Sequence, residues 1–158
     1  GFGLARMFSA EGRVTRSTVL QQVVEPARGN LAAMLGLAGE TLVFHLKRLR
    51  YVDERIYAVT DDYIPLALCP ELVRVDFTSS GLLRTLEAHG VRPYAEDKTI
   101  EVIHASPEIA LYLEVAEQAP IFVTRILTTD REGRVIQYAT SQADAFRSRF
   151  RVRSTIRE

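Results

Sequence analysis

Hydrophobic and polar residues alternate in several separate stretches of the chain, and each stretch predicts a strand. Successive side chains in a strand point to opposite faces, so a period of two marks a strand with one buried face. The alternation places strands at residues 15–25, 41–52, 55–64, 98–105, 121–129 and 135–142. Short polar turns at 53–54 and 130–133 join the second strand to the third and the fifth to the sixth. Both pairs are therefore predicted to form hairpins.

Leucines at helical spacing, next to residues that favour helix ends, predict three short helices between the strands. A capping side-chain oxygen stands near the start of each one, and glycine follows the first two. The predicted helices run from Asn30 to about Gly36 or Gly39, from 78–80 to 89–90, and from Ser106 to about Val115. The segment 65–70 begins and ends with proline, and we expect a single turn there.

This order of elements predicts the α+β class, with an antiparallel sheet of about six strands and flanking helices. Strict strand–helix–strand alternation, which is typical of a parallel sheet, is not found. We expect one layer of helices to cover the sheet. The tail from Phe146 to Val152 alternates basic and apolar residues in part, which predicts an additional edge strand with its charges facing water.

The composition fits a single domain that spans residues 1–158. The chain is 47% hydrophobic and 25% charged, so it can bury a core. Its 20 basic and 20 acidic residues cancel, so we expect no overall field that attracts a nucleic-acid backbone. No apolar run approaches the roughly 18 residues of a membrane-spanning helix, and there is no secretory signal. We therefore expect a cytoplasmic protein without membrane contact. Cys69 is the only cysteine, which excludes an internal disulfide.

The strand at 41–52 carries the most informative side chains. Phe44, Leu46, Arg48 and Arg50 share one face, so two guanidinium groups continue an apolar stripe. A buried cation is costly without a partner, and the pair therefore predicts a pocket that receives an anion. Arg125 lies on an apolar face of its own strand and would join them if the strands are neighbours.

A structural role for these arginines is the alternative interpretation. They could lie at strand ends and reach water, or pair with Asp61, Asp62 or Glu101. From the residues alone, this interpretation and the anion pocket stand about equal.

Metal and cofactor sites have little support in the sequence. His45, His89 and His104 lie far apart, and none has the spacing to an acid or a second histidine that helical metal sites require. There is no glycine-rich loop after a strand that could cradle a phosphate. We therefore expect neither a metal nor a cofactor.

Serines and carboxylates give little support to an enzyme. Ser79 and Ser80 lack a nucleophile motif, and capping of the following helix explains them, although with Gly81 they could form one wall of an anion site. Asp61 and Asp62 point to opposite faces of their strand and cannot act together on one substrate.

Short motifs along nearly the whole chain carry a resemblance to a known family. They are Glu11-Gly12, Val19-Leu20, Pro26-Ala27, Leu31-x-x-x-Leu35-Gly36-Leu37, Gly39-Glu40, Arg48-Leu49-Arg50, Asp62-Tyr63-Ile64-Pro65, Asp76-Phe77, Gly81-Leu82-Leu83-x-x-Leu86, Arg125, and Asp130-x-x-Gly133-Arg134 with Tyr138. In order and spacing they resemble the UTRA domain, the effector-sensing C-terminal domain of the HutC subfamily of GntR-type transcriptional regulators.

The resemblance implies a chorismate-lyase-type fold and a homodimer. It also implies a winged helix-turn-helix upstream, absent from this chain, through which alone the protein would bind DNA. A small anionic effector, such as a sugar phosphate or an organic acid, is expected, and the family's effector-contacting arginines fall at Arg48 and Arg50.

Three positions depart from the family's sugar-phosphate binders. The serine at the helix start falls at Gly81, and two acids fall at Thr60 and Gln137. The loss of two acids favours an effector with fewer amine or hydroxyl donors, such as a plain carboxylate.

Two other functions stay open. The same fold hosts an enzyme of the chorismate-lyase type acting on a small organic acid, although Thr60 and Gln137 are not the carboxylates that acid–base chemistry would need. A ligand-free dimerisation module would leave the arginines paired internally. In a dimer, we expect the contact near 146–152, because exposed edge strands pair readily.

Overall fold

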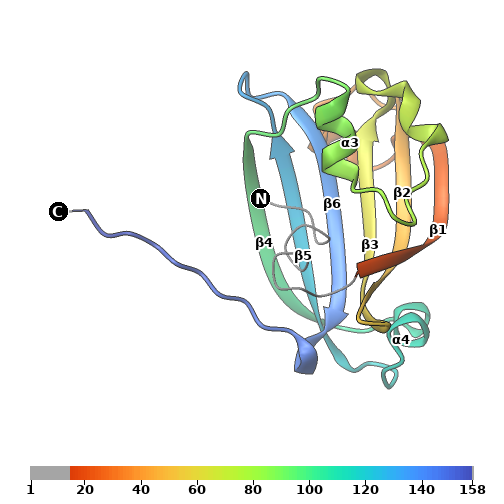
Figure 1. The fold of residues 1–158 in the computed structure, drawn as a ribbon, viewed down its shortest axis with the longest axis vertical. Helices are drawn as coiled ribbons and strands as arrows, with labels where there is room; N and C mark the ends of the chain where they lie inside the picture. The colour runs from red at the N-terminus through yellow and green to blue at the C-terminus, as the bar shows by residue number, and fades with distance from the viewer. Residues whose placement is uncertain (1–14, 158) are drawn as a thin grey trace.

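Six antiparallel strands form one sheet in the computed structural model, which describes residues 15–157 (Figure 1). The strands are β1 (Thr15–Pro26), β2 (Leu42–Val52), β3 (Arg55–Pro65), β4 (Ala95–His104), β5 (Pro120–Thr129) and β6 (Val135–Asp144). Their order across the sheet is β1-β2-β3-β6-β5-β4. The predicted α+β class and the six strands are confirmed. The motif Glu11-Gly12 lies outside the described residues.

Short helices fill the connections between the strands. They are α2 (Asn30–Met34), α3 (Leu82–Ala88) and α4 (Pro107–Leu113), with the 3-10 helices η1 (Leu66–Leu68), η2 (Pro70–Arg74) and η3 (Ala145–Arg147). The three predicted helices are thus present. The proline-bounded segment 65–70 contains the single turn η1, and the second turn, η2, begins at its last residue, Pro70.

Only one of the predicted helix caps forms. The backbone N–H of Ile109 donates to Ser106 Oγ at 3.2 Å, as expected for α4. Asn30 is instead the first residue of α2, and Gly29 precedes it without a side-chain cap. Gly81 occupies the corresponding position before α3, also without a side-chain cap. The capping role expected for Ser79 and Ser80 is therefore wrong, because α3 begins one residue too late for either hydroxyl to cap it.

Cross-strand pairing defines two faces of the sheet. Arg48 lies opposite Thr60, and Thr60 lies opposite Ser141, so these residues share one face. We call this the arginine face, and the opposite side, which carries His45, the histidine face. Figure 1 shows α3 in front of the sheet, on the arginine face, and α4 beside its lower end.

Apolar clusters cover both faces, so the expected single layer of helices is wrong. On the arginine face, Phe44 and Leu46 of β2 pack with Leu72 of η2 and Leu86 of α3. On the histidine face, α4 packs against β3 and β5, and α2 packs against the end of β2. The sheet is therefore the middle layer of the domain. This agrees with β2, in which eight of the eleven residues are buried on one face or the other.

The C-terminal tail does not form the edge strand predicted at 146–152. Asp144 Oδ1 accepts a hydrogen bond from the N–H of Phe146 at 3.1 Å, which begins η3. The chain after η3 then leaves the body of the domain in an extended path (Figure 1). No strand of residues 15–144 lies beside this segment to pair with it, and only Phe150 makes a ring contact, with Phe122 at 5.1 Å.

A buried turn residue closes the β5–β6 hairpin. Asp130 accepts hydrogen bonds from the N–H groups of Glu132 and Arg134 at 3.0 and 2.9 Å, and from Arg134 Nε at 2.9 Å. Gly133 follows with a φ of 82°, a conformation that favours glycine. Burial alone would raise the pKa of Asp130, but these hydrogen bonds and the Arg134 charge lower it below 3.8.

Core packing predicts the effect of truncating leucines on the two short helices. Leu86 of α3 is fully buried, whereas Leu111 of α4 is 81% exposed. Leu86→Ala should lower the free energy of unfolding by about 3 kcal/mol, because it leaves a cavity. Leu111→Ala is the matched control and should stay within about 0.5 kcal/mol of the parent in urea denaturation. Equal losses would contradict the packing described.

Asp130 predicts a pH dependence of stability with a defined sign. A carboxyl with a lowered folded-state pKa stabilises the fold above its unfolded-state pKa, near 3.8, and loses this contribution as the pH falls through the folded-state value. Asp130→Asn should therefore destabilise the domain at pH 7, and the difference from the parent should shrink toward pH 2. A difference that grows on acidification, measured by chemical denaturation, would show that the sign is wrong.

Candidate functional site

Arg48 and Arg50 project from β2, the second strand of the sheet. Their strand, β2, pairs with β1 on one side and β3 on the other. Arg48 lies between Val19 and Thr60, and Arg50 between Ser17 and Ala58. The two arginines are only 3% and 8% exposed. The interpretation in which they sit at strand ends and reach water therefore does not apply.

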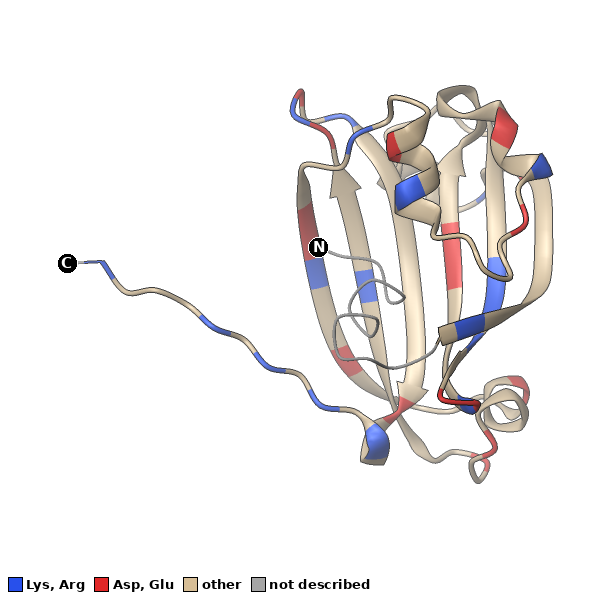
Figure 2. Cartoon of the chain, in the orientation of Figure 1, with Lys and Arg blue, Asp and Glu red and all other residues tan. Residues whose placement is uncertain are grey.

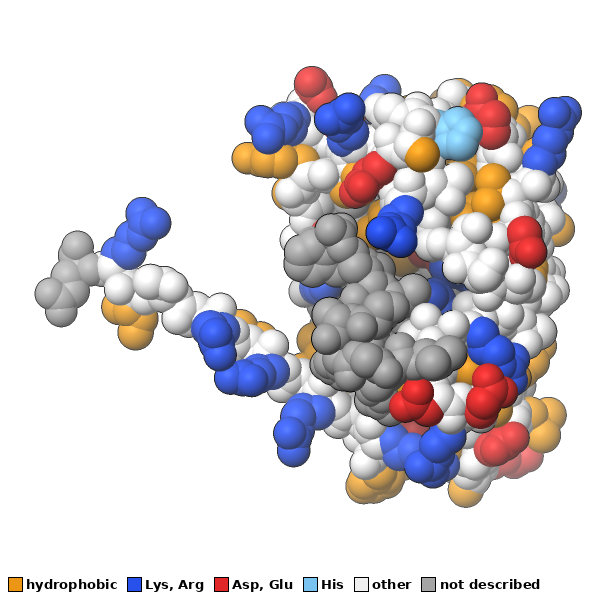
Figure 3. All heavy atoms as spheres, viewed as in Figure 1, with side chains coloured by type: hydrophobic (Ala, Val, Ile, Leu, Met, Phe, Trp, Pro, Cys, Tyr) orange, Lys and Arg blue, Asp and Glu red, His pale blue; other side chains and the backbone are white. Residues whose placement is uncertain are grey.

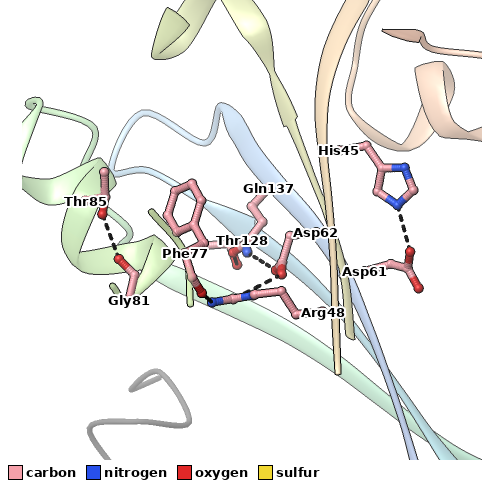
Figure 4. A network of polar contacts seen from close by, with 9 residues as sticks. All are labelled: His45, Arg48, Asp61, Asp62, Phe77, Gly81, Thr85, Thr128 and Gln137. Carbon is pink, nitrogen blue, oxygen red and sulfur yellow. Dashed lines mark hydrogen bonds and ion pairs between the residues drawn. The ribbon is translucent and has the colours of Figure 1, made fainter. Parts of the chain in front are cut away.

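Arg48 takes part in a buried polar network that crosses four strands, β2, β3, β6 and β5 (Figure 4). Its NH2 atom lies 3.6 Å from Asp62 Oδ2, and its NH1 atom donates to the Phe77 carbonyl at 3.4 Å. Gln137 Nε2 donates to Asp62 Oδ1 at 2.7 Å, and Thr128 Oγ1 donates to Gln137 Oε1 at 3.3 Å. The network fixes Asp62 firmly from the Gln137 side and holds Arg48 only by long contacts.

Arg50 is less well satisfied than Arg48. No carboxylate of residues 15–157 forms an ion pair with it, and its Nε has no hydrogen-bond partner. Arg48 Nε and Thr60 Oγ1 are also buried without a partner. Unsatisfied buried donors cost free energy, above all when they are charged. Three such atoms on one face make a site that an anion could complete.

The charges of this site are unbalanced. Burial and, to a smaller extent, the nearby Arg48 charge lower the pKa of Arg50 to about 10, against the attraction of Asp62. Burial likewise lowers the pKa of Arg48 and raises the pKa of Asp62, which the two arginines oppose. Arg50 still keeps its proton at neutral pH. Two guanidinium groups thus face a single carboxyl, which leaves an excess of positive charge.

The segment before α3 lies over the arginine face. The N–H of Ser17, opposite Arg50 in β1, donates to the Thr78 carbonyl at 3.1 Å. Ser79 is exposed, and Ser80 and Gly81 are half-buried. Gly81 gives its carbonyl to Thr85, whose Oγ1 donates at 2.8 Å (Figure 4). The surface is hollowed below α3, with Lys or Arg atoms visible inside the hollow (Figure 3).

Arg125 does not join the other two arginines. It pairs with Thr140 of β6, which lies opposite Asp61, so its side chain belongs to the histidine face. Its Nε lies 3.2 Å from Glu101 Oε1, and its side chain is 43% exposed. The expected convergence of three cations is therefore wrong, and Arg125 forms the structural pair that the alternative interpretation allowed.

Asp62 is the site residue that sequence reasoning undervalued. The sequence offered it as one of three acids that could pair with the arginines, and did not single it out as their partner. The available signal was its position two residues after Thr60, which places both side chains on one face. The neutral residues Thr60 and Gln137 do reach this site, Gln137 through Asp62 and Thr60 as the cross-strand neighbour of Arg48.

Asp61 points to the opposite face, as predicted, and contacts a buried histidine. His45 Nε2 lies 2.7 Å from Asp61 Oδ1, and the ring stacks on Tyr63 with centroids 4.3 Å apart. His45 Nδ1 lies 2.9 Å from Glu25 Oε1, but the two groups are not aligned as a hydrogen bond. The two adjacent aspartates therefore serve separate polar groups on the two faces.

In the described part of the chain, one cluster brings together three side chains of types that can bind a metal ion. Potential ligand atoms of Cys69, Glu71 and His89 all lie within 4.8 Å of one another. Cys69 is buried in the core, whereas Glu71 and His89 are exposed. This group lies at the C-terminal end of α3, away from the Gly81 end of the helix, so it is separate from the arginine site.

Two further features bear on possible sites. A cavity of about 260 Å³ lies near the start of β3 and η3, between residues that include Ile56, Leu113 and Arg147. Neither Arg48 nor Arg50 lines this cavity.

Within residues 15–157, no helix is both long and apolar enough to cross a membrane.

Comparisons with known proteins agree on one family. The model of the UTRA domain matches residues 10–148. A probable fructoselysine utilization operon transcriptional repressor of Escherichia coli strain K12 is 23% identical over 128 residues, which cover 80% of this chain and 52% of that protein. The regulator GgaR of the same strain is 23% identical over 111 residues, 70% of this chain and 44% of its own. The chain thus spans about half the length of these curated relatives.

Solved structures share the fold. The effector domain of PhnF from Mycobacterium smegmatis aligns with a TM-score of 0.92 at 18% identity, covering 99% of this chain and 97% of that one. The C-terminal domain of the histidine utilization repressor from Pseudomonas syringae pv. tomato aligns with a TM-score of 0.83 at 18% identity, covering 90% and 100%. With the family model covering most of the sequence, and the fold matching these regulator domains, the chain belongs to the UTRA domain family, the regulatory domains of GntR-type transcriptional regulators.

Proposed function

We propose that this domain senses a small anionic effector through the arginine face. The observation that carries the proposal is the pair of buried guanidinium groups whose Nε atoms lack partners. A carboxylate or phosphate can accept paired hydrogen bonds from a guanidinium, which Asp62, 3.6 Å from the Arg48 NH2 atom, does not supply. The binding residues would be Arg48, Arg50 and Thr60, with Ser79, Ser80 and Gly81 at the rim and Gln137 acting through Asp62.

An organic acid fits this site better than a sugar phosphate rich in donors. Thr60 and Gln137 are neutral, and the side-chain amide of Gln137 already donates a hydrogen bond to Asp62. Asp62 is thus the single carboxylate in the described network, and it is engaged by Gln137 and Arg48. An effector with many hydroxyl or amine donors would find few free acceptors on this face.

The regulatory role rests on the relatives. We infer that residues 1–158 form a single ligand-binding and dimerisation domain of a cytoplasmic protein, with a winged helix-turn-helix upstream that binds DNA. An effector can shift DNA binding only by its difference in affinity for two arrangements of the homodimer. The relatives' names, a transcriptional repressor and an HTH-type transcriptional regulator, support this role.

Two alternatives predict different behaviour of the bound acid. An enzyme would convert it, whereas a sensor returns it unchanged. The described network contains one carboxyl, and that group is already paired, which disfavours acid–base catalysis there. A ligand-free module would bind none of the anions.

Arg50→Met should abolish stabilisation by an anionic effector. The panel consists of organic acids, sugar phosphates, amino acids and phosphonates, tested by thermal shift. A ligand at 100 times its dissociation constant stabilises the folded state by about 2.7 kcal/mol. The variant keeps an apolar stem and removes an unpaired buried charge, so the ligand-free domain should remain folded.

Arg125→Met is the matched control, because it removes a cation from the histidine face. It should keep the full shift with the same ligand. A shift that survives Arg50→Met but disappears in Arg125→Met would contradict the assigned site, and no shift with any member of the panel would favour the ligand-free module. A preference for sugar phosphates over organic acids would overturn only the proposed ligand class.

Arg48 should differ from Arg50 in its effect on stability. Arg48→Met leaves Asp62 buried with no cation in contact, and should cost roughly 3 kcal/mol of unfolding free energy. Combining it with Asp62→Asn, which keeps an acceptor for Gln137, should recover at least 0.5 kcal/mol of that cost in a double-mutant cycle. Strictly additive losses in urea denaturation would mean that the two side chains are not coupled.

A further inference from the structure

The cluster at the C-terminal end of α3 combines three kinds of metal ligand. Potential ligand atoms of Cys69, Glu71 and His89 all lie within 4.8 Å of one another. Thiolate, carboxylate and imidazole are the ligands that Zn²⁺ uses in proteins. Spacing along the sequence did not indicate this cluster, because Cys69 and Glu71 belong to the segment at η2, whereas His89 ends α3. Only the fold brings the three side chains together.

Hydrogen bonds fix the backbone on both sides of the cluster. The N–H of Cys69 donates to the Leu66 carbonyl at 3.2 Å, and the N–H of Leu72 donates to the Cys69 carbonyl at 3.2 Å. At the end of α3, the N–H of His89 donates to the Leu86 carbonyl at 3.0 Å. Cys69, Leu72 and Leu86 also pack in one core cluster. The ligands are therefore carried by anchored backbone, which lowers the entropic cost of binding.

His89 is held in the tautomer that a metal ligand needs. Its Nδ1 lies 2.9 Å from the carbonyl oxygen of Thr85. A carbonyl oxygen can only accept a hydrogen bond, so Nδ1 carries the proton and Nε2 keeps a free lone pair. Metal-binding histidines typically make this kind of hydrogen bond through their other ring nitrogen. Nε2 of His89 is therefore available as a ligand.

The surroundings of the cluster suit a cation. Cys69 is buried, whereas Glu71 and His89 are exposed, so the cluster lies where the core meets solvent. Figure 2 shows acidic and basic positions on both η2 and α3, which lie at the same end of the sheet. The charges here are mixed, in contrast to the excess of positive charge on the arginine face. A divalent cation can thus reach the cluster without being repelled.

We propose that Cys69, Glu71 and His89 bind one Zn²⁺ ion, with a water molecule as the fourth ligand. Zn²⁺ lies about 2.0–2.3 Å from such ligands, which sets them roughly 3.5 Å apart in a tetrahedral site. The two exposed side chains can close this difference by changing rotamer. The Cys69 thiol releases its proton to solvent as the sulfur–zinc bond forms. The thiolate favours Zn²⁺ over Mg²⁺ or Ca²⁺, which prefer oxygen ligands.

The role of the bound ion is structural. It closes residues 69–89 into a loop, and this loop contains η2 and α3, the layer that covers the arginine face. A metal clip of this kind stabilises the folded state by restricting the unfolded chain. Neither Arg48 nor Arg50 is a ligand, so the zinc site does not depend on the proposed anion site.

Cobalt substitution is the first test, because Co²⁺ absorbs light in a way that reports its ligands. One equivalent of Co²⁺ added to the reduced, tag-free chain of 158 residues should give a thiolate-to-metal charge-transfer band and the visible bands of a tetrahedral site. An excess of Zn²⁺ should remove both by displacing the cobalt. Cys69→Ser should lose the charge-transfer band. A parent chain that shows neither band overturns the proposal.

Ligand variants with a matched control test the remaining assignments. Glu71→Gln and His89→Gln change exposed side chains, so both should fold. Loss of an outer-shell partner alone costs roughly 10- to 100-fold in metal affinity, and loss of a ligand should raise the zinc dissociation constant at least as much. Competition with a chromophoric chelator measures this. His104→Gln should bind zinc like the parent, because His104 is also exposed and its Nδ1 also contacts a carbonyl, that of Gln118. Parent-like affinity in His89→Gln, or weakened binding in His104→Gln, overturns the site.

Thermal unfolding separates the zinc site from the anion site. Zn²⁺ should raise the unfolding midpoint of the parent and of Arg50→Met, but not that of His89→Gln. An equal rise in His89→Gln overturns the zinc site. The anion panel, run in the presence of EDTA, tests the arginine face without zinc, so failure of either proposal leaves the other standing.

Discussion

The burial of two guanidinium groups beside a single carboxyl is the constraint on which the arginine face depends. Arg48 and Arg50 lie on β2, which is flanked by β1 and β3, and both side chains are buried away from water. Asp62 is anchored by Gln137, so it cannot turn to serve both cations. The layer of η2 and α3 excludes solvent from the same region. Charge compensation is left incomplete inside a packed structure, which is costly for folding and is the basis of the anion site proposed above.

The alternation within single strands was enough to predict much of this arrangement. Phe44, Leu46, Arg48 and Arg50 do share a face, and Asp61 and Asp62 do point apart, because a period of two is a property of any strand. The hairpins were also predictable from their turns, of which Asp130 and its hydrogen bonds are the best defined. These inferences needed only neighbours along the chain.

Relations between strands were the part that the sequence did not reveal. Whether Arg125 shares a face with Arg48 depends on the register of four strands, and a shift of one residue reverses the answer. The same holds for Asp62, whose contact with Gln137 joins residues 75 positions apart. An irregularity at Arg50/Tyr51 alters the β2–β3 register locally. Which face each helix covers is likewise set by how the connections cross the sheet, and periodicity alone does not specify that path.

The hydrogen bond from the Ser17 N–H to the Thr78 carbonyl links the edge strand β1 to the arginine site. Thr78 directly follows Phe77, whose carbonyl is the second contact of Arg48. An anion that draws the Arg48 guanidinium away from that carbonyl would free this segment to move, and Ser17 would move with it. Because β1 is the first described element of the chain, a displacement of Ser17 would move the N-terminal end of β1. Two hydrogen bonds, from Arg48 to the Phe77 carbonyl and from Ser17 to the Thr78 carbonyl, therefore connect the arginine site to the start of β1.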